Sequence, residues 1–160
     1  MINTFDGEFA FLSNFYEQKS RIMDGWGNRY PTVEHAFQAM KTTERQKRSE
    51  IANAATPGKA KRLGRQVQLR PDWEEIKEDV MRACLRAKFS NPALGEKLLA
   101  TGDQWLEEGN TWHDNYWGVC QCERCQDIRG RNRLGHLLME LREEMRNGSQ
   151  TNEVAHLQQF

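Results

Sequence analysis

The stretch that decides the fold is Pro31-Thr32-Val33-Glu34-His35-Ala36-Phe37-Gln38-Ala39-Met40-Lys41. Thr32 stands where a helix N-cap belongs and Pro31 precedes it, so the stretch predicts the opening turns of a helix. One side has the i, i+3, i+4, i+7 spacing of a core-facing surface, with Val33, Ala36, Phe37 and Met40. A line beside it carries a carboxylate, an amide and an ammonium group, from Glu34, Gln38 and Lys41. A polar line at the border of a core predicts a cleft, and its plainer interpretation is a solvated helix edge.

Length and composition predict one compact domain with a single core, because the chain has 160 residues and no internal repeat. The formal net charge is zero, which is unlike proteins that bind nucleic acid through their overall charge. No apolar run approaches the ~20 residues that cross a bilayer, and the N-terminus lacks a signal-peptide pattern. We therefore expect a cytoplasmic protein without a membrane partner.

The periodic segments predict a mainly α fold of about six helices, or α+β when a small N-terminal hairpin around Asp24-Gly25 is counted. Residues 5–16 are interpreted as an extended segment that ends in a loop. Capping signals mark two later helix starts, Thr56-Pro57 and a capping box of Asp72 with Glu75. The domain is expected to span residues 1–147, with a loose polar tail at 148–160.

Two further segments suggest a ligand. Lys59, Arg62 and Arg65 lie toward one side of the predicted helix after Thr56, either as a phosphate clamp or as a solvated basic face. Residues 111–118 pack aromatic rings around Asp114 and an amide, as a pocket for a flat heterocycle requires. The alternative for this second segment is a tryptophan-rich corner of the core.

Four separated segments, in matching order and spacing, give the chain a resemblance to a known family over residues 5–146. They are Phe11-Leu12-Ser13-Asn14-Phe15, the Thr32 to Lys41 helix, the Trp73 to Phe89 segment with Val80-Met81-Arg82-Ala83, and Asp114 to Trp117 followed by Asn132-Arg133-Leu134-Gly135-His136. They resemble the NADAR (NAD- and ADP-ribose-associated) family, whose bacterial members include YbiA-like N-glycosidases of riboflavin-pathway intermediates.

The resemblance implies a hydrolase that cleaves an N-glycosidic bond between a ribose phosphate, or ADP-ribose, and a heterocyclic base or amine. Carried over by position, the family's acidic residue is Glu34 and its lysine is Lys41. Its pocket positions fall on Asn14, Phe15, Gln38, Asp114, Trp117 and Asn132. Asp114 is a candidate to protonate the leaving nitrogen or to hold a ribose hydroxyl, and Trp117 is a candidate to stack on the base. Arg62, Arg65 and Arg133 are candidates for phosphate.

The chemistry fits these residue types. Breaking a ribosyl C–N bond builds positive charge at the anomeric carbon, which a carboxylate such as Glu34 stabilises. Lys41 is either an amine nucleophile that forms a Schiff base or a phosphate ligand, and both roles stay open. His35 is interpreted as structural, since it lies about 100° around the helix from Glu34.

A cysteine cluster departs from the YbiA-like pattern. Cys120, Cys122 and Cys125 have C-x-C-x2-C spacing and can hold a structural zinc ion with a fourth ligand such as His113. The alternative is three reduced thiols, as is usual inside cells. No cofactor is expected to be required for catalysis.

Two other functions compete with hydrolysis of a small phosphoribosyl substrate. One is removal of ADP-ribose from guanine in nucleic acid, in which ADP-ribosylated nucleic acid is the partner. The other is a non-catalytic module that binds ADP-ribose or NAD. The presence of both Glu34 and Lys41 disfavours the module.

Overall fold

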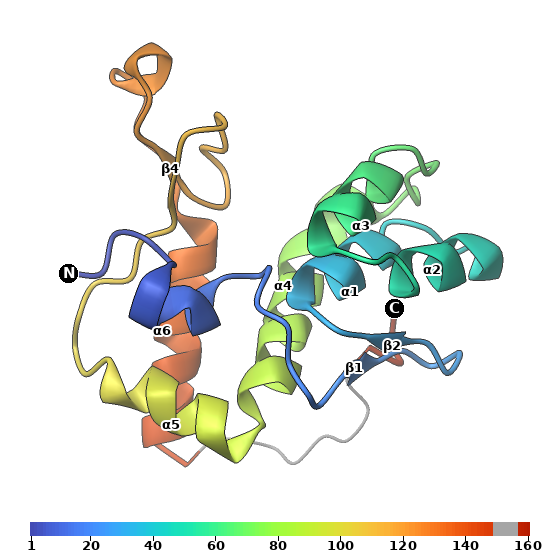
Figure 1. The fold of residues 1–160 in the computed structure, drawn as a ribbon, viewed down its shortest axis with the longest axis horizontal. Helices are drawn as coiled ribbons and strands as arrows, with labels where there is room; N and C mark the ends of the chain where they lie inside the picture. The colour runs from blue at the N-terminus through green and yellow to red at the C-terminus, as the bar shows by residue number, and fades with distance from the viewer. Residues whose placement is uncertain (149–156) are drawn as a thin grey trace. The chain divides into compact units, whose positions relative to one another are not determined.

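The computed structural model describes residues 1–148 and 157–160. Helices form most of the regular structure in these residues (Figure 1), which confirms the mainly α prediction. The described part of the chain contains six α-helices: α1 (Val33–Ala39), α2 (Arg45–Ala52), α3 (Pro57–Gly64), α4 (Trp73–Phe89), α5 (Pro92–Ala100) and α6 (Arg133–Arg146). It also contains two 3-10 helices, η1 (Gly7–Leu12) and η2 (Glu123–Cys125), and the strands β1 (Ile22–Met23), β2 (Arg29–Tyr30), β3 (Gly109–Asn110) and β4 (Val119–Cys120). Within the same residues, every helix is too short or too polar to cross a membrane.

The described residues divide into two compact units. The α1–α4 unit comprises residues 14–91 and 157–160. The α5–α6 unit comprises residues 1–13 and 92–148.

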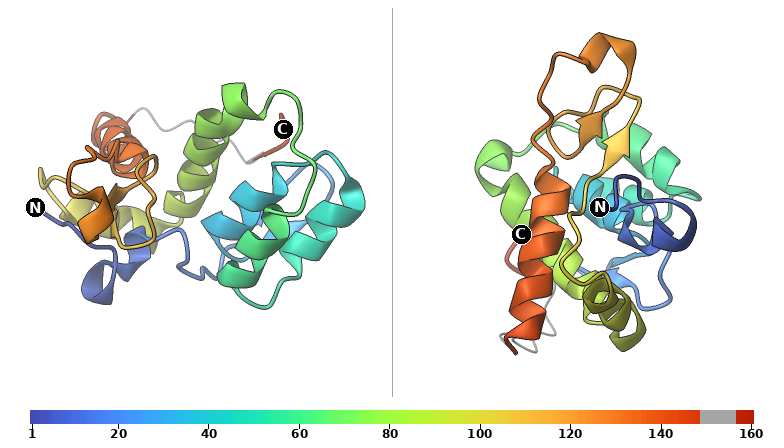
Figure 2. Two further views of the ribbon diagram at one scale, coloured as in Figure 1. Left: turned by 90° about the horizontal axis from the view of Figure 1, so that it is seen from above. Right: turned by 90° about the vertical axis from the view of Figure 1, so that its left-hand side faces the viewer.

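Helix α1 is the centre of the α1–α4 unit, where α2, α3 and α4 all pack against it (Figure 2). The predicted core side is confirmed, since Val33, Ala36, Phe37 and Met40 are buried. The remaining residues of α1 are buried as well, including Glu34, His35 and Gln38. The interpretation as a solvated helix edge is therefore wrong, because neighbouring helices cover the polar side too. Polar groups enclosed in this way need partners in the protein or in a ligand.

The ends of α1 follow local signals. Thr32 is the N-cap, and its Oγ1 accepts a hydrogen bond from the His35 backbone N–H at 3.1 Å. The His35 ring is held between Thr32 Oγ1 (2.8 Å) and the Ala54 carbonyl (3.0 Å). Burial lowers the pKa of His35, so the ring is neutral and structural as predicted. The helix ends at Ala39, with Met40 as C-cap, so Lys41 lies in the following turn and not in the helix.

The predicted hairpin is confirmed. Strands β1 and β2 pair antiparallel, with Ile22 opposite Tyr30. The turn is closed by the Asp24 carboxylate, which accepts from the backbone N–H groups of Trp26 (2.9 Å) and Asn28 (3.0 Å) and from the Tyr30 hydroxyl (2.7 Å). This carboxylate also lies 3.8 Å from the buried guanidinium of Arg48. The turn signal and the tertiary ion pair therefore use the same side chain.

The end of the predicted tail packs on the α1–α4 unit. Leu157 is fully buried and forms a β-bridge with Asp24. The Phe160 carbonyl accepts hydrogen bonds from Arg48 (2.9 Å) and Arg70 (2.8 Å). The expectation of a loose tail is therefore wrong for residues 157–160, because the packed Leu157 and the bonded Phe160 carbonyl hold them in place. Residues 149–156 of the tail lie outside the described residues.

One local prediction holds only in part and another is wrong. Asp72 is the N-cap residue of α4, as predicted, but its side chain makes no cap bond to the helix. Its carboxylate pairs with the Arg70 guanidinium instead, at 2.6 Å. Residues Gly7–Leu12 form η1 where an extended segment was expected. There Gly7 has φ +53°, a value that favours glycine, and it turns the chain into the short helix.

In the α5–α6 unit, α5 packs on α6, and the apolar side of α6 is buried at Leu134, Leu137, Leu138 and Leu141. Strands β3 and β4 pair in parallel, with Asn110 opposite Cys120. The chain between these strands carries the aromatic loop found in the sequence. The cysteine-rich segment follows β4 directly.

Candidate active site

The strongest candidate site surrounds Glu34 on α1. The Glu34 side chain is only 7% exposed, and its Oε1 accepts a hydrogen bond from Gln38 Nε2 at 2.7 Å, one turn further along the helix. Two residues of the predicted polar line, Glu34 and Gln38, are therefore in direct contact. A carboxylate held in a largely water-free setting acts more strongly on a nearby positive charge than one in solvent.

Two buried amide oxygens of residues in this region lack partners in the described protein. Gln38 Oε1 and Asn14 Oδ1 are buried, and neither accepts a hydrogen bond there. Asn14 is joined to Glu34 through the backbone, since the Glu34 N–H donates to the Asn14 carbonyl at 3.0 Å. Buried acceptors are rarely left unpaired, so a ligand donor is a natural partner for them.

Lys41 completes this group from the turn after α1. Its Nζ lies 5.8 Å from the centre of the Phe37 ring and 6.0 Å from that of Trp73. Burial lowers the pKa of Lys41, the charge of Glu34 opposes that shift, and the charges of Arg65 and Lys61 add to it. An amine with a lowered pKa is neutral more of the time and is a better nucleophile.

Helix α4 contributes buried sulfur-containing side chains to this region. Asn14 Nδ2 lies 3.7 Å from Met81 Sδ. The Cys84 thiol is fully buried, and burial together with the charge of Glu34 raises its pKa. Cys84 is therefore a neutral core residue on the buried side of α4.

The predicted phosphate ligands of α3 lie at the surface. Arg62 and Arg65 are exposed, and Arg65 is close enough for its charge to lower the pKa of Lys41. Lys61 acts on Lys41 in the same way, although the sequence analysis did not select it. Phe15, next to Asn14, is 45% exposed. Arg65 and Lys61 therefore place positive charge near Lys41.

Trp73 is a second residue that sequence reasoning missed. Trp73 is buried, and its ring packs on Phe37 with a centroid distance of 5.1 Å and contributes to the surroundings of Lys41. No pattern in the chain joins residue 41 to residue 73. Only the packing of α4 on α1 brings them together.

The other predicted residues lie in the α5–α6 unit. Asp114 Oδ1 accepts hydrogen bonds from the backbone N–H groups of Tyr116 (3.0 Å) and Trp117 (2.9 Å), so this carboxylate shapes its own loop. The Trp117 ring stands edge to face with that of Tyr116, with centroids 4.9 Å apart. The Arg133 backbone N–H donates to the Tyr116 carbonyl at 3.1 Å, which ties the start of α6 to this loop.

Asn132 is buried and has a left-handed backbone, φ +47°. Its Oδ1 accepts from the Glu108 backbone N–H at 3.1 Å, and its Nδ2 donates to the Leu106 carbonyl at 2.9 Å. Both ends of the side chain therefore bond the backbone of the same unit. The predicted site residues thus fall into one group around Glu34 and another around Asp114, in different units.

A cluster of potential metal ligands lies in the same unit as Asp114. The ligand atoms of His113, Cys120, Cys122 and Cys125 all lie within 4.8 Å of one another. The C-x-C-x2-C spacing predicted the three cysteines as ligands, with His113 as a candidate for the fourth. The structure confirms that the four side chains meet, and as a group they could hold a metal ion.

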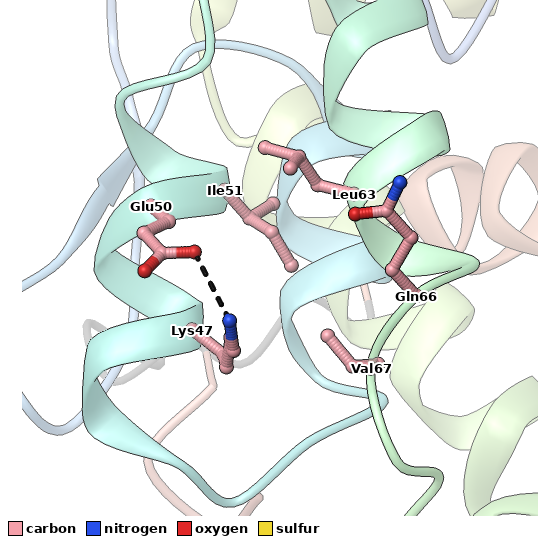
Figure 3. Close-up of a pocket in the computed structure, with 6 residues that line it drawn as sticks. All are labelled: Lys47, Glu50, Ile51, Leu63, Gln66 and Val67. Carbon is pink, nitrogen blue, oxygen red and sulfur yellow. Dashed lines mark hydrogen bonds and ion pairs between the residues drawn. The ribbon is translucent and has the colours of Figure 1, made fainter.

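A small pocket between α2 and α3 is separate from these groups (Figure 3). It is lined by Lys47, Glu50, Ile51, Leu63, Gln66 and Val67. Its charged groups satisfy each other, with Lys47 Nζ 3.5 Å from Glu50 Oε2. None of its lining residues belongs to the predicted site.

Comparison with known proteins gives one consistent family. The family model described as "NADAR domain" matches residues 3–146, a range that includes residues of both units. N-glycosidase YbiA of Shigella flexneri serotype 5b is 43% identical over 141 residues, which is 86% of this chain and 82% of that protein. A riboflavin biosynthesis protein of Vibrio vulnificus is 36% identical over 152 residues, which is 93% of this chain and 39% of that protein.

A solved structure agrees with the fold. The NMR structure of the E. coli protein YbiA superposes with a TM-score of 0.76 at 36% sequence identity. The match covers 96% of this chain and 93% of that one. The similarity therefore extends over nearly the whole length of both proteins.

Proposed function

Since the chain belongs to the NADAR family, we propose that it is an N-glycosidase that hydrolyses the C–N bond between a ribose phosphate and a heterocyclic base or amine. A relative from Vibrio vulnificus is named as a riboflavin biosynthesis protein. Ribosylaminopyrimidine phosphates of that pathway are therefore the first substrates to test.

One observation carries the proposal: Glu34 is buried beside Gln38 and Asn14, whose amide oxygens have no partner in the described protein. A ribose presents hydroxyl groups, and an aminopyrimidine presents N–H groups. Both can donate to such oxygens, so the substrate supplies the hydrogen bonds that the folded chain lacks.

Glu34 acts on the charge that develops during bond cleavage. As the C–N bond lengthens, positive charge builds at the anomeric carbon and at the ring oxygen. The buried carboxylate stabilises this charge, and Gln38 Nε2 holds Glu34 Oε1 in place. Preorganised charge of this kind supplies much of the rate enhancement of hydrolases.

We assign Lys41 the role of nucleophile. The neutral amine forms a bond to the anomeric carbon while the bond to the base breaks, and the base leaves with a proton. The ring C–O bond then opens, with a proton on the ring oxygen, to give a Schiff base on Nζ. Water adds to the imine, and its hydrolysis releases the sugar phosphate and restores the amine. Burial and the neighbouring cations Arg65 and Lys61 favour the neutral amine.

The remaining candidates have supporting roles. In the α1–α4 unit, Arg62 and Arg65, with Lys61, offer cations for the phosphate, and Phe15 offers a ring for the base. In the α5–α6 unit, Trp117 is a separate candidate to stack on the base. Arg133 is a second candidate for the phosphate. Asp114 either protonates the leaving nitrogen or binds a ribose hydroxyl. Asn132 is proposed as a positioning residue, because both of its amide ends bond the backbone. The steps assigned to Glu34 and Lys41 use no metal ion.

The test compares wild type, Glu34→Gln and Glu50→Gln by mass spectrometry of the released base and sugar. Glu50 lies on the surface of α2, where its ion pair contributes little to stability, so it controls for the loss of one carboxylate. We expect Glu34→Gln to lose at least ~100-fold in turnover while it still binds substrate. Full activity of that variant would remove Glu34 from the mechanism.

A second arm supplies ADP-ribosylated guanine in DNA. Release of base only in this arm would replace the riboflavin-pathway substrate with the nucleic-acid one. No release in either arm, with tight binding of ADP-ribose in a titration, would support a non-catalytic module instead.

The role of Lys41 is tested separately by adding cyanoborohydride during turnover, because it reduces a Schiff base to a stable amine. We expect a covalent sugar phosphate adduct on Lys41 in wild type and none in Lys41→Arg. An active Lys41→Arg enzyme without an adduct would assign this residue to phosphate binding.

A further inference from the structure

We propose that His113, Cys120, Cys122 and Cys125 form a structural zinc site, with His113 Nδ1 and the three Sγ atoms as the ligands. The inference does not depend on the activity proposed above. The four side chains come from a short stretch around β4, and no disulfide joins any of them, since the chain's four cysteines are all free.

The distances between the ligand atoms fit one tetrahedral ion. His113 Nδ1 lies 3.3 Å from Cys122 Sγ, 3.4 Å from Cys125 Sγ and 4.0 Å from Cys120 Sγ. Cys120 and Cys122 Sγ are 3.3 Å apart. Zn–S bonds of about 2.3 Å and a Zn–N bond of about 2.0 Å place tetrahedral ligand atoms roughly 3.5 to 3.8 Å apart. The four distances above bracket these values, and all four ligand atoms lie within 4.8 Å of one another.

The backbone is shaped to bring these ligands together. His113 has φ +68°, a left-handed conformation that is uncommon outside glycine. Cys120 ends β4, opposite Asn110 of β3. The 3-10 helix η2 then turns the chain back so that Cys125 approaches the same point. A strained residue in an exposed loop indicates a constraint that the loop alone does not explain.

A second layer of hydrogen bonds supports the ligands. Asn115 Nδ2 donates to Cys125 Sγ at 3.3 Å, and Asn115 Oδ1 accepts from the Cys120 backbone N–H at 3.0 Å. Outer partners that orient the ligands and stabilise thiolate charge are a common feature of protein zinc sites. Asn115 lies between Asp114 and Tyr116, so the cluster also braces the loop that carries Asp114 and Trp117.

The ligand set selects the metal and its role. Three thiolates and an imidazole in tetrahedral positions favour zinc over magnesium or calcium, which prefer oxygen ligands. Four protein ligands also fill the coordination sphere and leave no position for water or substrate. The ion is therefore structural, and it fixes residues 113–125.

Metal analysis of protein purified without chelator is the first test. We expect close to one zinc per chain in wild type, and near zero in Cys122→Ala and His113→Ala. The matched controls are His136→Ala, a histidine of α6 that contacts Trp105, and Cys84→Ala, the one cysteine outside the cluster. Both controls should keep their zinc. Wild-type protein that contains no zinc and binds none when it is supplied would overturn the proposal.

X-ray absorption at the zinc edge identifies the ligands in the wild-type protein, so this test does not depend on the variants. Wild type should give three sulfur ligands at about 2.3 Å and one nitrogen at about 2.0 Å. A shell of oxygen and nitrogen alone would mean that zinc binds elsewhere on the surface, which would also overturn the site.

Hydrogen exchange tests the structural role. Removal of zinc with a chelator should speed amide exchange throughout residues 113–125 and leave that of α4 unchanged. Unchanged exchange in residues 113–125 after the metal has gone would refute the bracing role.

Discussion

Gly64 sets the distance between α3 and the candidate active site. A Cβ atom built on Gly64 would lie 2.0 Å from Gln38 Oε1 and 2.8 Å from both Cβ and Cδ of Gln38. Gln38 is 3% exposed and bonds Glu34, so it has little room to move away. The change Gly64→Ala must therefore displace either the Gln38 side chain or α3 itself.

The expected loss of stability follows from these contacts. Overpacking a close-packed site costs about 1–3 kcal/mol, and loss of the charge-assisted bond to Glu34 adds about 1.5–3 kcal/mol. Alanine is the better helix former by about 1 kcal/mol, which offsets part of the loss. We expect Gly64→Ala to lower the free energy of unfolding by about 1.5–5 kcal/mol and to reduce turnover, because Glu34 loses its orienting partner.

Gly58→Ala is the matched control in the same helix. A Cβ at Gly58 meets only Thr56 Oγ1, at 3.9 Å, so this variant should be as stable as wild type or slightly more stable. Urea unfolding of both variants measures the difference. A Gly64→Ala protein as stable and as active as Gly58→Ala would refute the reasoning. The double variant Gly64→Ala/Gln38→Ala should lose less than the sum of the two single changes, since Gln38→Ala removes Oε1 and Cδ, two of the three Gln38 atoms that clash with the new methyl group.

Three further predictions follow from buried charged and titratable groups. Asp24→Asn should lower the free energy of unfolding in urea by about 3–5 kcal/mol, because it leaves the buried Arg48 guanidinium without its counter-charge; a loss below about 1 kcal/mol would show that the Phe160 carbonyl and the Trp26 ring suffice. The rate of a Lys41 nucleophile should rise with pH through a pKa below the ordinary 10.5, because deprotonation creates the reactive amine; a fall over the same pH range would instead identify a phosphate ligand. The lowered pKa of His35 should make the protein less stable as pH falls below 6.5, because the unfolded chain then binds a proton that the folded chain excludes. His35→Gln should flatten that dependence in urea titrations at pH 5 to 7, and an unchanged slope would assign it to another group.

Local signals were sufficient where the physics is local. The Thr32 cap, the Asp24-Gly25 turn and the periodicity of α4 each depend on residues a few positions apart, and the structure has all three. The Asp72 capping box failed because Arg70 competes for the same carboxylate. The Asp72 carboxylate forms an ion pair instead of a cap bond, and the capping pattern contains no term for the nearby Arg70.

The candidate site was located only in part from the chain. Glu34 and Gln38 share one side of a short helix, so their contact follows from helical spacing. The burial of that side does not follow, since it depends on α3 and α4 packing over it. The cysteine cluster could be predicted in part. The spacing of the three cysteines indicated a metal site, but only the fold shows that His113 lies beside them.

Caps, turns and periodicity act over one or two turns of chain, so they were enough to predict the six α-helices, the hairpin and the shared side of Glu34 and Gln38, but not the 3-10 helix η1. The tertiary structure alone decided that the polar side of α1 is enclosed, that Trp73 flanks Lys41, and that Gly64 leaves room for Gln38. The reason is that burial, and with it the pKa of an amine or the need of an amide for a partner, depends on residues distant in sequence that come together only when the helices pack.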